Sequence, residues 1–180
     1  MASPVPRSPG VYAWYFKQIP PNVPTADCLT IDGLTLLYVG ISPKAPPKSG
    51  RPPSRQTMRS RLRYHMCGNA EGSTLRLTLG CLLAAPLGLE LRRVGSGTRL
   101  TFCDGEQRLS EWLSENAFVA WEVCSEPWVL EEHLIRDVPL PLNLDQNSHH
   151  HFCPALTVAR RTARDAAGRL PVWCPVLPSP

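Results

Sequence analysis

The sequence lacks the features of a membrane or secreted protein. No apolar run approaches the ~18 to 20 residues needed to cross a bilayer. The opening stretch from Met1 to Gly10 has no apolar segment of the kind that a secretion signal needs. The seven cysteines are odd in number, and none forms a Cys-x-x-Cys pair, which argues against a disulfide framework. We therefore expect reduced thiols and a cytoplasmic location.

The chain also has little excess charge. Its formal net charge of +4 is too small to indicate a nucleic-acid partner by itself. The distribution is more informative, because seven of the 19 Lys and Arg residues lie between Lys44 and Arg63, whereas residues 106–132 are acidic. One end of the molecule could bind phosphate, and a solvated basic loop is the alternative explanation of the same pattern.

Length and proline content suggest the domain organisation. With 180 residues, 43% of them apolar, the chain suits one compact core. The 20 prolines gather at residues 4–24, 43–53 and 171–180. We predict an N-terminal tail (1–9), one domain (10–150) with insert loops at 17–33 and 43–53, and a C-terminal helix with a proline-rich tail (151–180).

Side-chain patterns predict a mixed set of helices and strands. β-branched and aromatic residues predict strands over 10–16, 34–41 and 118–123. Composition and apolar spacing predict helices over 54–66, 73–85, 107–116, 127–137 and 157–167. Ser54 would cap the first helix, and Gly68 or Asn69 would end it. Two short extended pieces are expected around Gly95-Ser96-Gly97, and the mixture favours an α+β layer fold.

Five short motifs occur in a fixed order along the chain. They are Gly10-Val11-Tyr12, Tyr38-Val39-Gly40, Arg61-x-x-x-His65, Glu131 in Glu-Glu-His-Leu-Ile, and Asn143 in Pro-Leu-Asn. Each is weak alone, but the ordered set resembles the GIY-YIG endonuclease superfamily and spans most of the chain. The sequence departs from that family in the long gap between the two tyrosines and in the insert that precedes the helix with Arg61.

The resemblance implies a fold and a reaction. The fold would be a small three-stranded, mostly antiparallel sheet flanked by helices, and the reaction metal-dependent hydrolysis of DNA. Glu131 would hold Mg²⁺ or Mn²⁺, Arg61 would clamp the phosphate, and Tyr12, assisted by Tyr38 or His65, would position or activate water. Asn143 would tie the backbone of the site together through its amide.

Periodicity tests two of these assignments independently. In the helix at 127–137, Glu131 falls within the apolar arc, whereas Glu132 falls outside it, where it can pair with Arg136. A carboxylate on the apolar side is costly without a partner or a metal, so Glu131 is the candidate ligand. In the first strand, Tyr12 and Trp14 would face one side of the sheet.

Other residues have open interpretations. His65 shares a helix face with Arg61, and a partly buried structural histidine is the alternative to a catalytic one. Candidate contacts to the nucleic-acid backbone, which could equally be plain solvent charges, are Lys44, Lys48, Arg55, Arg59 and Arg63. His149-His150-His151 with Cys153 could ligate zinc, but adjacent histidines rarely converge on one tetrahedral ion.

The partner is expected to be DNA, with RNA as an alternative, and a second copy or a protein partner would supply sequence specificity. The alternative function on the same fold is a nucleic-acid-binding module without catalysis. Intact Arg61 and Glu131 argue against that alternative, because a pure binder has little need of a carboxylate that faces phosphate.

Overall fold

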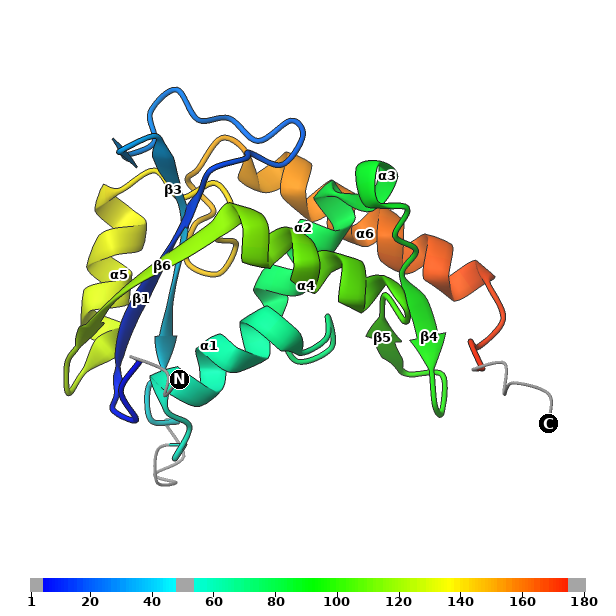
Figure 1. The fold of residues 1–180 in the computed structure, drawn as a ribbon, viewed down its shortest axis with the longest axis horizontal. Coiled ribbons are helices and arrows are strands. Elements are labelled where there is room, and N and C mark those ends of the chain that lie inside the picture. The colour runs from blue at the N-terminus through cyan, green and yellow to red at the C-terminus, as the bar shows by residue number, and fades with distance from the viewer. Residues whose placement is uncertain (1–4, 48–53, 175–180) are drawn as a thin grey trace.

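The computed structural model describes residues 5–47 and 54–174, which hold an antiparallel sheet of four strands in the order β2-β3-β1-β6 (Figure 1). The strands are β1 (Gly10–Phe16), β2 (Thr30–Ile31), β3 (Leu34–Ser42) and β6 (Ala117–Val123). The α+β class and the three strands expected from side-chain patterns are confirmed. The two tyrosine motifs therefore lie on neighbouring strands, with Tyr12 directly opposite Gly40.

The prediction of a three-stranded sheet was wrong by one short strand. β2 pairs with the start of β3 through Thr30 and Ile31, inside a segment expected to be irregular. The intervening Asp32 and Gly33 have φ values of 50° and 76°, the left-handed pair that a tight hairpin turn requires. Two residues are too few to show a strand period, so only this turn dipeptide marked the hairpin.

The sheet separates two clusters of buried side chains. Tyr12, Trp14 and Phe16 are no more than 1% exposed and belong to the main core. Ala13 and Tyr15 point to the opposite face and pack against a smaller cluster under helix α5 (Pro127–Asp137). The predicted alternation of β1 is confirmed, and it directs Tyr12 toward the helices on the main-core side.

Five other helices and a small hairpin complete the described chain. The helices are α1 (Met58–Cys67), α2 (Thr74–Leu82), α3 (Ala84–Leu87), α4 (Gly105–Asn116) and α6 (Cys153–Arg169). The hairpin joins β4 (Arg92–Val94) to β5 (Arg99–Thr101) around the Gly-Ser-Gly turn, as predicted. In Figure 1, α5 covers one face of the sheet, while α1, α2 and α4 lie on the other. None of the helices in the described part of the chain combines the length and hydropathy that a membrane span needs.

The structure corrects several predicted helix boundaries. α1 begins at Met58 rather than at residue 54, because its cap is Thr57, whose Oγ1 accepts from Ser60 N at 3.3 Å. The end at Gly68 is confirmed. The helix expected at 73–85 divides into α2 and α3, and α6 begins four residues before the predicted start of the last helix. The proposed division of the chain at residue 150 stays a prediction.

A buried ion pair connects three of the main-core helices. Arg76 on α2 is fully buried, and its Nε and Nη2 donate to Glu106 Oε2 of α4 at 3.0 and 2.7 Å. Its Nη1 donates to the carbonyl oxygens of His65 and Met66, at the end of α1. The other carboxylate oxygen of Glu106 accepts from Ala70 N at 2.8 Å. The pair therefore sets where α1 ends relative to α2 and α4.

We predict that Arg76→Met destabilises the fold by about 3–5 kcal/mol, because it leaves the charge of the Glu106 carboxylate unpaired and removes the guanidinium donor of the His65 and Met66 carbonyl groups. Urea denaturation would measure the loss. The control is Arg136→Met, since Arg136 pairs with Asp137 at the surface, with side chains 61% and 58% exposed, and such pairs contribute about 0–1 kcal/mol. Equal losses in the two variants would show that the buried pair does not hold the helices.

Candidate active site

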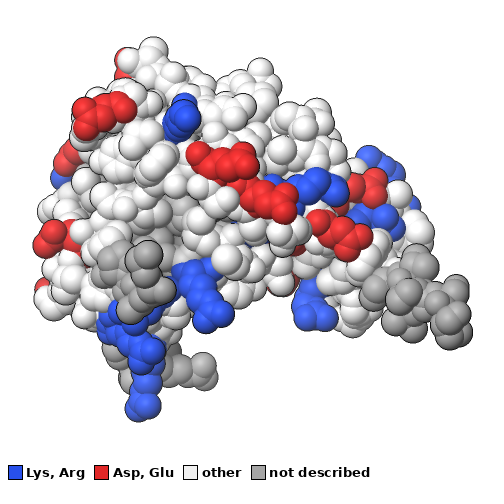
Figure 2. Space-filling view, in the orientation of Figure 1, with Lys and Arg blue, Asp and Glu red and all other residues white. Residues whose placement is uncertain are grey.

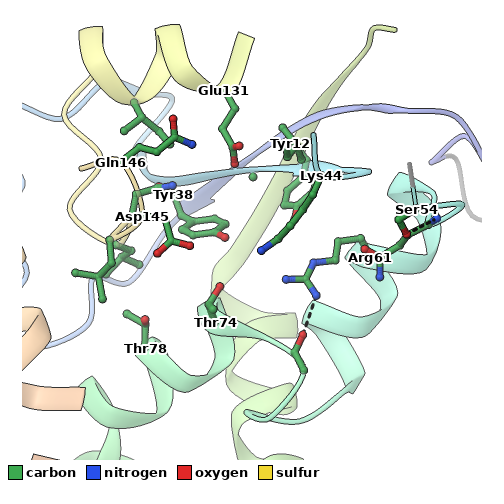
Figure 3. A pocket seen from close by; sticks show the side chains of 18 of the residues that line it. Tyr12, Tyr38, Lys44, Ser54, Arg61, Thr74, Thr78, Glu131, Asp145 and Gln146 are labelled. Atoms are coloured by element: carbon green, nitrogen blue, oxygen red, sulfur yellow. Dashed lines mark hydrogen bonds between the residues drawn. The ribbon is translucent and has the colours of Figure 1, made fainter. Parts of the chain in front are cut away.

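A pocket of about 380 Å³ opens between the sheet and the surrounding helices (Figure 3). Its walls come from β1, β3, α1, α2, α5, α6 and the loop after α5. Five of the six residues predicted to be catalytic line it: Tyr12, Tyr38, Arg61, Glu131 and Asn143. They are up to 131 positions apart in the sequence (12 to 143), so the fold alone brings them together.

Tyr12 lies at the back of the pocket, and the position of its side chain requires the glycine opposite it on β3. A Cβ at Gly40 would lie 2.7 Å from the Tyr12 hydroxyl oxygen and 2.8 Å from its ring carbons, closer than real Cβ atoms approach other atoms. The glycine of the second motif is thus required so that the phenol can cross β3. Burial, and then the neighbouring Tyr38, raise the pKa of Tyr12 well above its ordinary value, although Arg61 opposes the shift. Tyr12 is therefore a neutral phenol at neutral pH.

His65 does not reach the pocket surface and lies behind Tyr12. Its side chain is fully buried, its Nε2 is 2.8 Å from the Tyr12 hydroxyl, and its Nδ1 is 2.7 Å from Ser73 Oγ. Burial, together with the charges of Arg61 and Arg76, lowers the pKa of His65 well below 6.5. The ring is therefore neutral, with one nitrogen a donor and the other an acceptor. It contacts Tyr12 directly and holds its hydroxyl in place.

Glu131 projects from α5 into the pocket, toward Tyr12 and Lys44 (Figure 3). Burial raises the pKa of its carboxyl from 4.5 to about 7, with Lys44 lowering it and Asp145 raising it. Within the described chain the carboxylate has neither a hydrogen bond nor an ion pair. Glu132 is exposed, as periodicity predicted. The expected pairing of Glu132 with Arg136 was wrong, because the guanidinium of Arg136 bonds the adjacent Asp137.

Two basic side chains face Glu131 from other elements (Figure 3). Arg61 of α1 donates from Nη1 to the Gly72 carbonyl oxygen at 2.7 Å, and this bond anchors the guanidinium at the pocket wall. Lys44 reaches the pocket from the loop after β3. A carboxylate and two cations thus face one space without forming an ion pair, an arrangement suited to a ligand that carries both phosphate oxygens and a metal ion.

Asn143 clamps the loop after α5 to the middle of β3. Its Oδ1 accepts from Val39 N at 3.0 Å, and its Nδ2 donates to Val39 O at 2.9 Å. A further backbone bond joins Leu142 N to Leu37 O at 3.0 Å. β2 pairs only as far as Thr35 of β3, so the Asn143 amide takes the place of a neighbouring strand. The expected backbone-tying contact of Asn143 is present.

Comparison with known families agrees with this geometry. The model of the GIY-YIG catalytic domain matches residues 10–162. The chain belongs to the GIY-YIG family. That family is one of endonucleases, so the chain carries a nuclease domain. No curated protein and no solved structure matches the chain significantly.

The basic residues predicted to contact nucleic acid occupy different settings in this GIY-YIG domain. Arg55 and Arg63 are exposed, whereas Arg59 donates from Nε to the Val5 carbonyl oxygen at 2.6 Å. Lys44 lines the pocket, and Lys48 lies outside the described residues. Figure 2 shows basic side chains near the start of α1 and the N-terminal segment, and acidic ones over α4. Of the four predicted residues that the structure describes, Lys44 lines the pocket.

Sequence reasoning missed several pocket residues: Thr74 and Thr78 of α2, Asp145 and Gln146 of the loop, and Arg160 of α6. Asp145 could have been suspected, since it lies two residues after Asn143. Arg160 is one of several arginines in a helix predicted only to be basic, and no sequence pattern distinguishes it from the rest. Its position follows from how α6 packs.

The donor set of the pocket suits a metal ion that substrate helps to bind. The described residues contain no group of three or more His, Cys, Asp or Glu side chains that could hold a metal ion. Glu131 nonetheless offers unpaired carboxylate oxygens, the donor that Mg²⁺ and Mn²⁺ prefer. Mg²⁺ commonly binds through one or two carboxylates together with substrate phosphate. The residues therefore fit a metal ion held jointly with phosphate, and they do not form a closed protein cage.

The histidine run lies away from this pocket. His149, His150 and His151 line a second pocket of about 280 Å³ with Asp27 and residues 136–139. The rings of His150 and His151 stack with centroids 4.7 Å apart. Stacked neighbours direct their nitrogens along similar lines rather than toward one ion, and a zinc role gains no support from this arrangement.

We predict that Glu131→Gln stabilises the metal-free protein at pH 8 by on the order of 1 to 3 kcal/mol. The pKa of Glu131 is about 7 in the folded protein and 4.5 ordinarily. Ionisation of this carboxyl therefore lowers the free energy of unfolding above pH 7, and it has no effect at a pH where the folded and unfolded states are both protonated. The advantage of the variant should therefore shrink between about pH 7 and pH 4.5. Urea denaturation in EDTA across that range, with Glu132→Gln as control, would measure it. A pH-independent difference would contradict the burial of this carboxylate.

Proposed function

We propose that this GIY-YIG domain is a metal-dependent endonuclease that hydrolyses phosphodiester bonds in DNA. The observation that carries the proposal is the convergence of Tyr12, Arg61 and Glu131, from three separate elements, in one pocket. The desolvated, unpaired state of the Glu131 carboxylate supports it further. A buried carboxylate without a partner is costly, and a cation bound there would remove that cost.

Arg61 and Lys44 would bind the scissile phosphate. The Gly72 carbonyl engages one Nη1 donor of Arg61, and the remaining donors of the guanidinium fork can bind two phosphate oxygens at once. Lys44, which also lines the pocket, adds a point charge. Because the Arg61 side chain is anchored before substrate arrives, less conformational entropy is lost on binding.

Tyr12 and His65 would move the proton of the attacking water. The raised pKa of Tyr12 makes a free phenolate an unsuitable base at neutral pH. The phenol can instead accept the water proton at its oxygen while passing its own proton to His65 Nε2, 2.8 Å away. This requires the tautomer in which Nδ1–H donates to Ser73 Oγ. Tyr38, which also lines the pocket, would help to orient the water.

Glu131 would hold the divalent cation, Mg²⁺ or Mn²⁺, through its carboxylate oxygens. When bound, the cation supplies positive charge that neutralises the developing charge on the phosphate and leaving oxygens. Asn143 would act at a distance from the reacting atoms by fixing the backbone of β3, which carries Tyr38 and Gly40.

The proposal extends to the substrate, the partner and the location of the protein. DNA is the proposed substrate and RNA the alternative, since the charged groups of the pocket would bind phosphate, which both nucleic acids carry. Arg55 and Arg63 are exposed near the start and middle of α1 and would contact the nucleic-acid backbone outside the pocket. A second copy or a protein partner would supply sequence specificity, and the proposed location is the cytoplasm.

Cleavage of supercoiled plasmid and of a branched DNA in Mg²⁺ or Mn²⁺ tests the proposal. We expect the wild type to cut and EDTA to stop it. Glu131→Gln should lower the rate by at least about 10²- to 10³-fold because the cation loses its anchor. Arg61→Lys should lower it by about 10- to 100-fold, since an ammonium cannot replace the two-pronged guanidinium.

Glu132→Gln is the matched control, because it removes an exposed carboxylate one residue away and should cut like the wild type. Equal cleavage by the wild type and Glu131→Gln would identify the activity as contamination. Binding of DNA without any cleavage would favour a nucleic-acid-binding module on the same fold.

A further inference from the structure

Arg160 reaches the active-site pocket from the C-terminal helix. α6 lies beside α2 in Figure 1 and is anchored in the main core by Leu156 and Ala167, which are fully buried. From this anchored helix Arg160 lines the pocket on a different element from Arg61. Tyr38, Thr78 and Asp145 also line the pocket. α6 therefore supplies a guanidinium whose position the core determines.

Arg160 has no hydrogen-bond or ion-pair partner among the residues that the structure describes. It belongs to none of the three ion pairs among residues 5–47 and 54–174, and its Nε is buried without a hydrogen-bond partner. Burial, and then the nearby Arg164, lower the pKa of its guanidinium. Arg160 is half-buried, and a guanidinium partly removed from water without a partner is costly.

The hydrogen bonds of Arg76 differ from those of Arg160, and the difference indicates different roles for the two arginines. Arg76 is fully buried and donates to the Glu106 carboxylate, to carbonyl oxygens and to Ser110 Oγ. Those bonds occupy its donors and give it a structural role. Arg160 lines the pocket instead and makes no hydrogen bond among the described residues, so its guanidinium can bind a ligand there. Asp145, the nearby acid, is exposed and makes no ion pair with it.

We propose that Arg160 binds a backbone phosphate next to the scissile one, so that the substrate is a DNA strand that continues past the point of cleavage. This inference rests on the proposed nuclease function. A guanidinium fork matches the paired oxygens of a phosphodiester. Arg61 and Lys44 already face Glu131 and take the scissile phosphate, so Arg160 on the α6 side binds its neighbour along the strand.

Binding in EDTA tests this role without any cleavage. Fluorescence anisotropy would measure the affinity of a labelled single-stranded oligonucleotide across a range of salt concentrations. We expect Arg160→Met to weaken binding by about 10- to 100-fold. It should also lower the slope of log K against log salt by about 0.7, the value for one lost phosphate contact on a single strand. Arg160→Lys should keep most of the slope, because it keeps the charge.

Arg169→Met is the matched control on the same helix. Arg169 is exposed and nine residues further on, hence about 180° around the helix from Arg160, and its loss should leave affinity and slope unchanged. If Arg160→Met also left the slope unchanged, or if Arg169→Met lowered it equally, the phosphate contact would be refuted.

Cleavage of a substrate with one phosphate decides which phosphate Arg160 contacts. We expect Arg160→Met to raise KM for an oligonucleotide with kcat nearly unchanged, and to leave kcat/KM for thymidine p-nitrophenyl phosphate unchanged. An equal loss on both substrates would overturn the adjacent-phosphate role. Loss of slope in a protein that cleaves neither substrate would support the subsite and contradict the nuclease function, so the two failures are distinguishable.

Discussion

The buried ion pair of Arg76 and Glu106 is the contact on which the helical side of this molecule depends. Arg76 binds the last carbonyls of α1 and the first turn of α4, while Glu106 also accepts from the amides of Ala70 and Phe102. These bonds saturate both charged groups, which is the condition under which a buried pair is tolerated. α1 carries Arg61 and His65, so the pair determines where those side chains lie relative to the sheet.

A second chain of contacts leads from this pair to the Tyr12 hydroxyl. Ser73 caps α2 by accepting from Arg76 N at 3.1 Å, and the same oxygen lies 2.7 Å from His65 Nδ1. His65 in turn holds the Tyr12 hydroxyl. The Tyr12 phenol is thus positioned by groups that also build the core, and burial raises its pKa although the nearby Arg61 lowers it. Such an arrangement favours a neutral phenol that exchanges protons through its partner over a free phenolate.

Much of the fold could be predicted from local patterns, because local spacing determines local structure. The limits of β1 and α5, and the inward direction of Glu131 against Glu132, follow from periods of two and about 3.6 residues. β2 could not be predicted in this way, since two residues carry no period, and the start of α1 depended on which of two hydroxyl residues capped it. His65 illustrates a deeper limit: spacing placed it beside Arg61, but only packing decided that it would lie behind Tyr12.

The sequence by itself determined the family, the five ordered motifs and five of the residues that line the pocket. Those features depend on residue type and spacing, which are present before the chain folds. Tertiary structure alone decided that Gly40 must lack a side chain beneath Tyr12, that Asn143 completes the edge of β3, and that Arg160 reaches the pocket from α6. Each is a contact between segments distant in the sequence, and its existence depends on how the helices pack across the sheet.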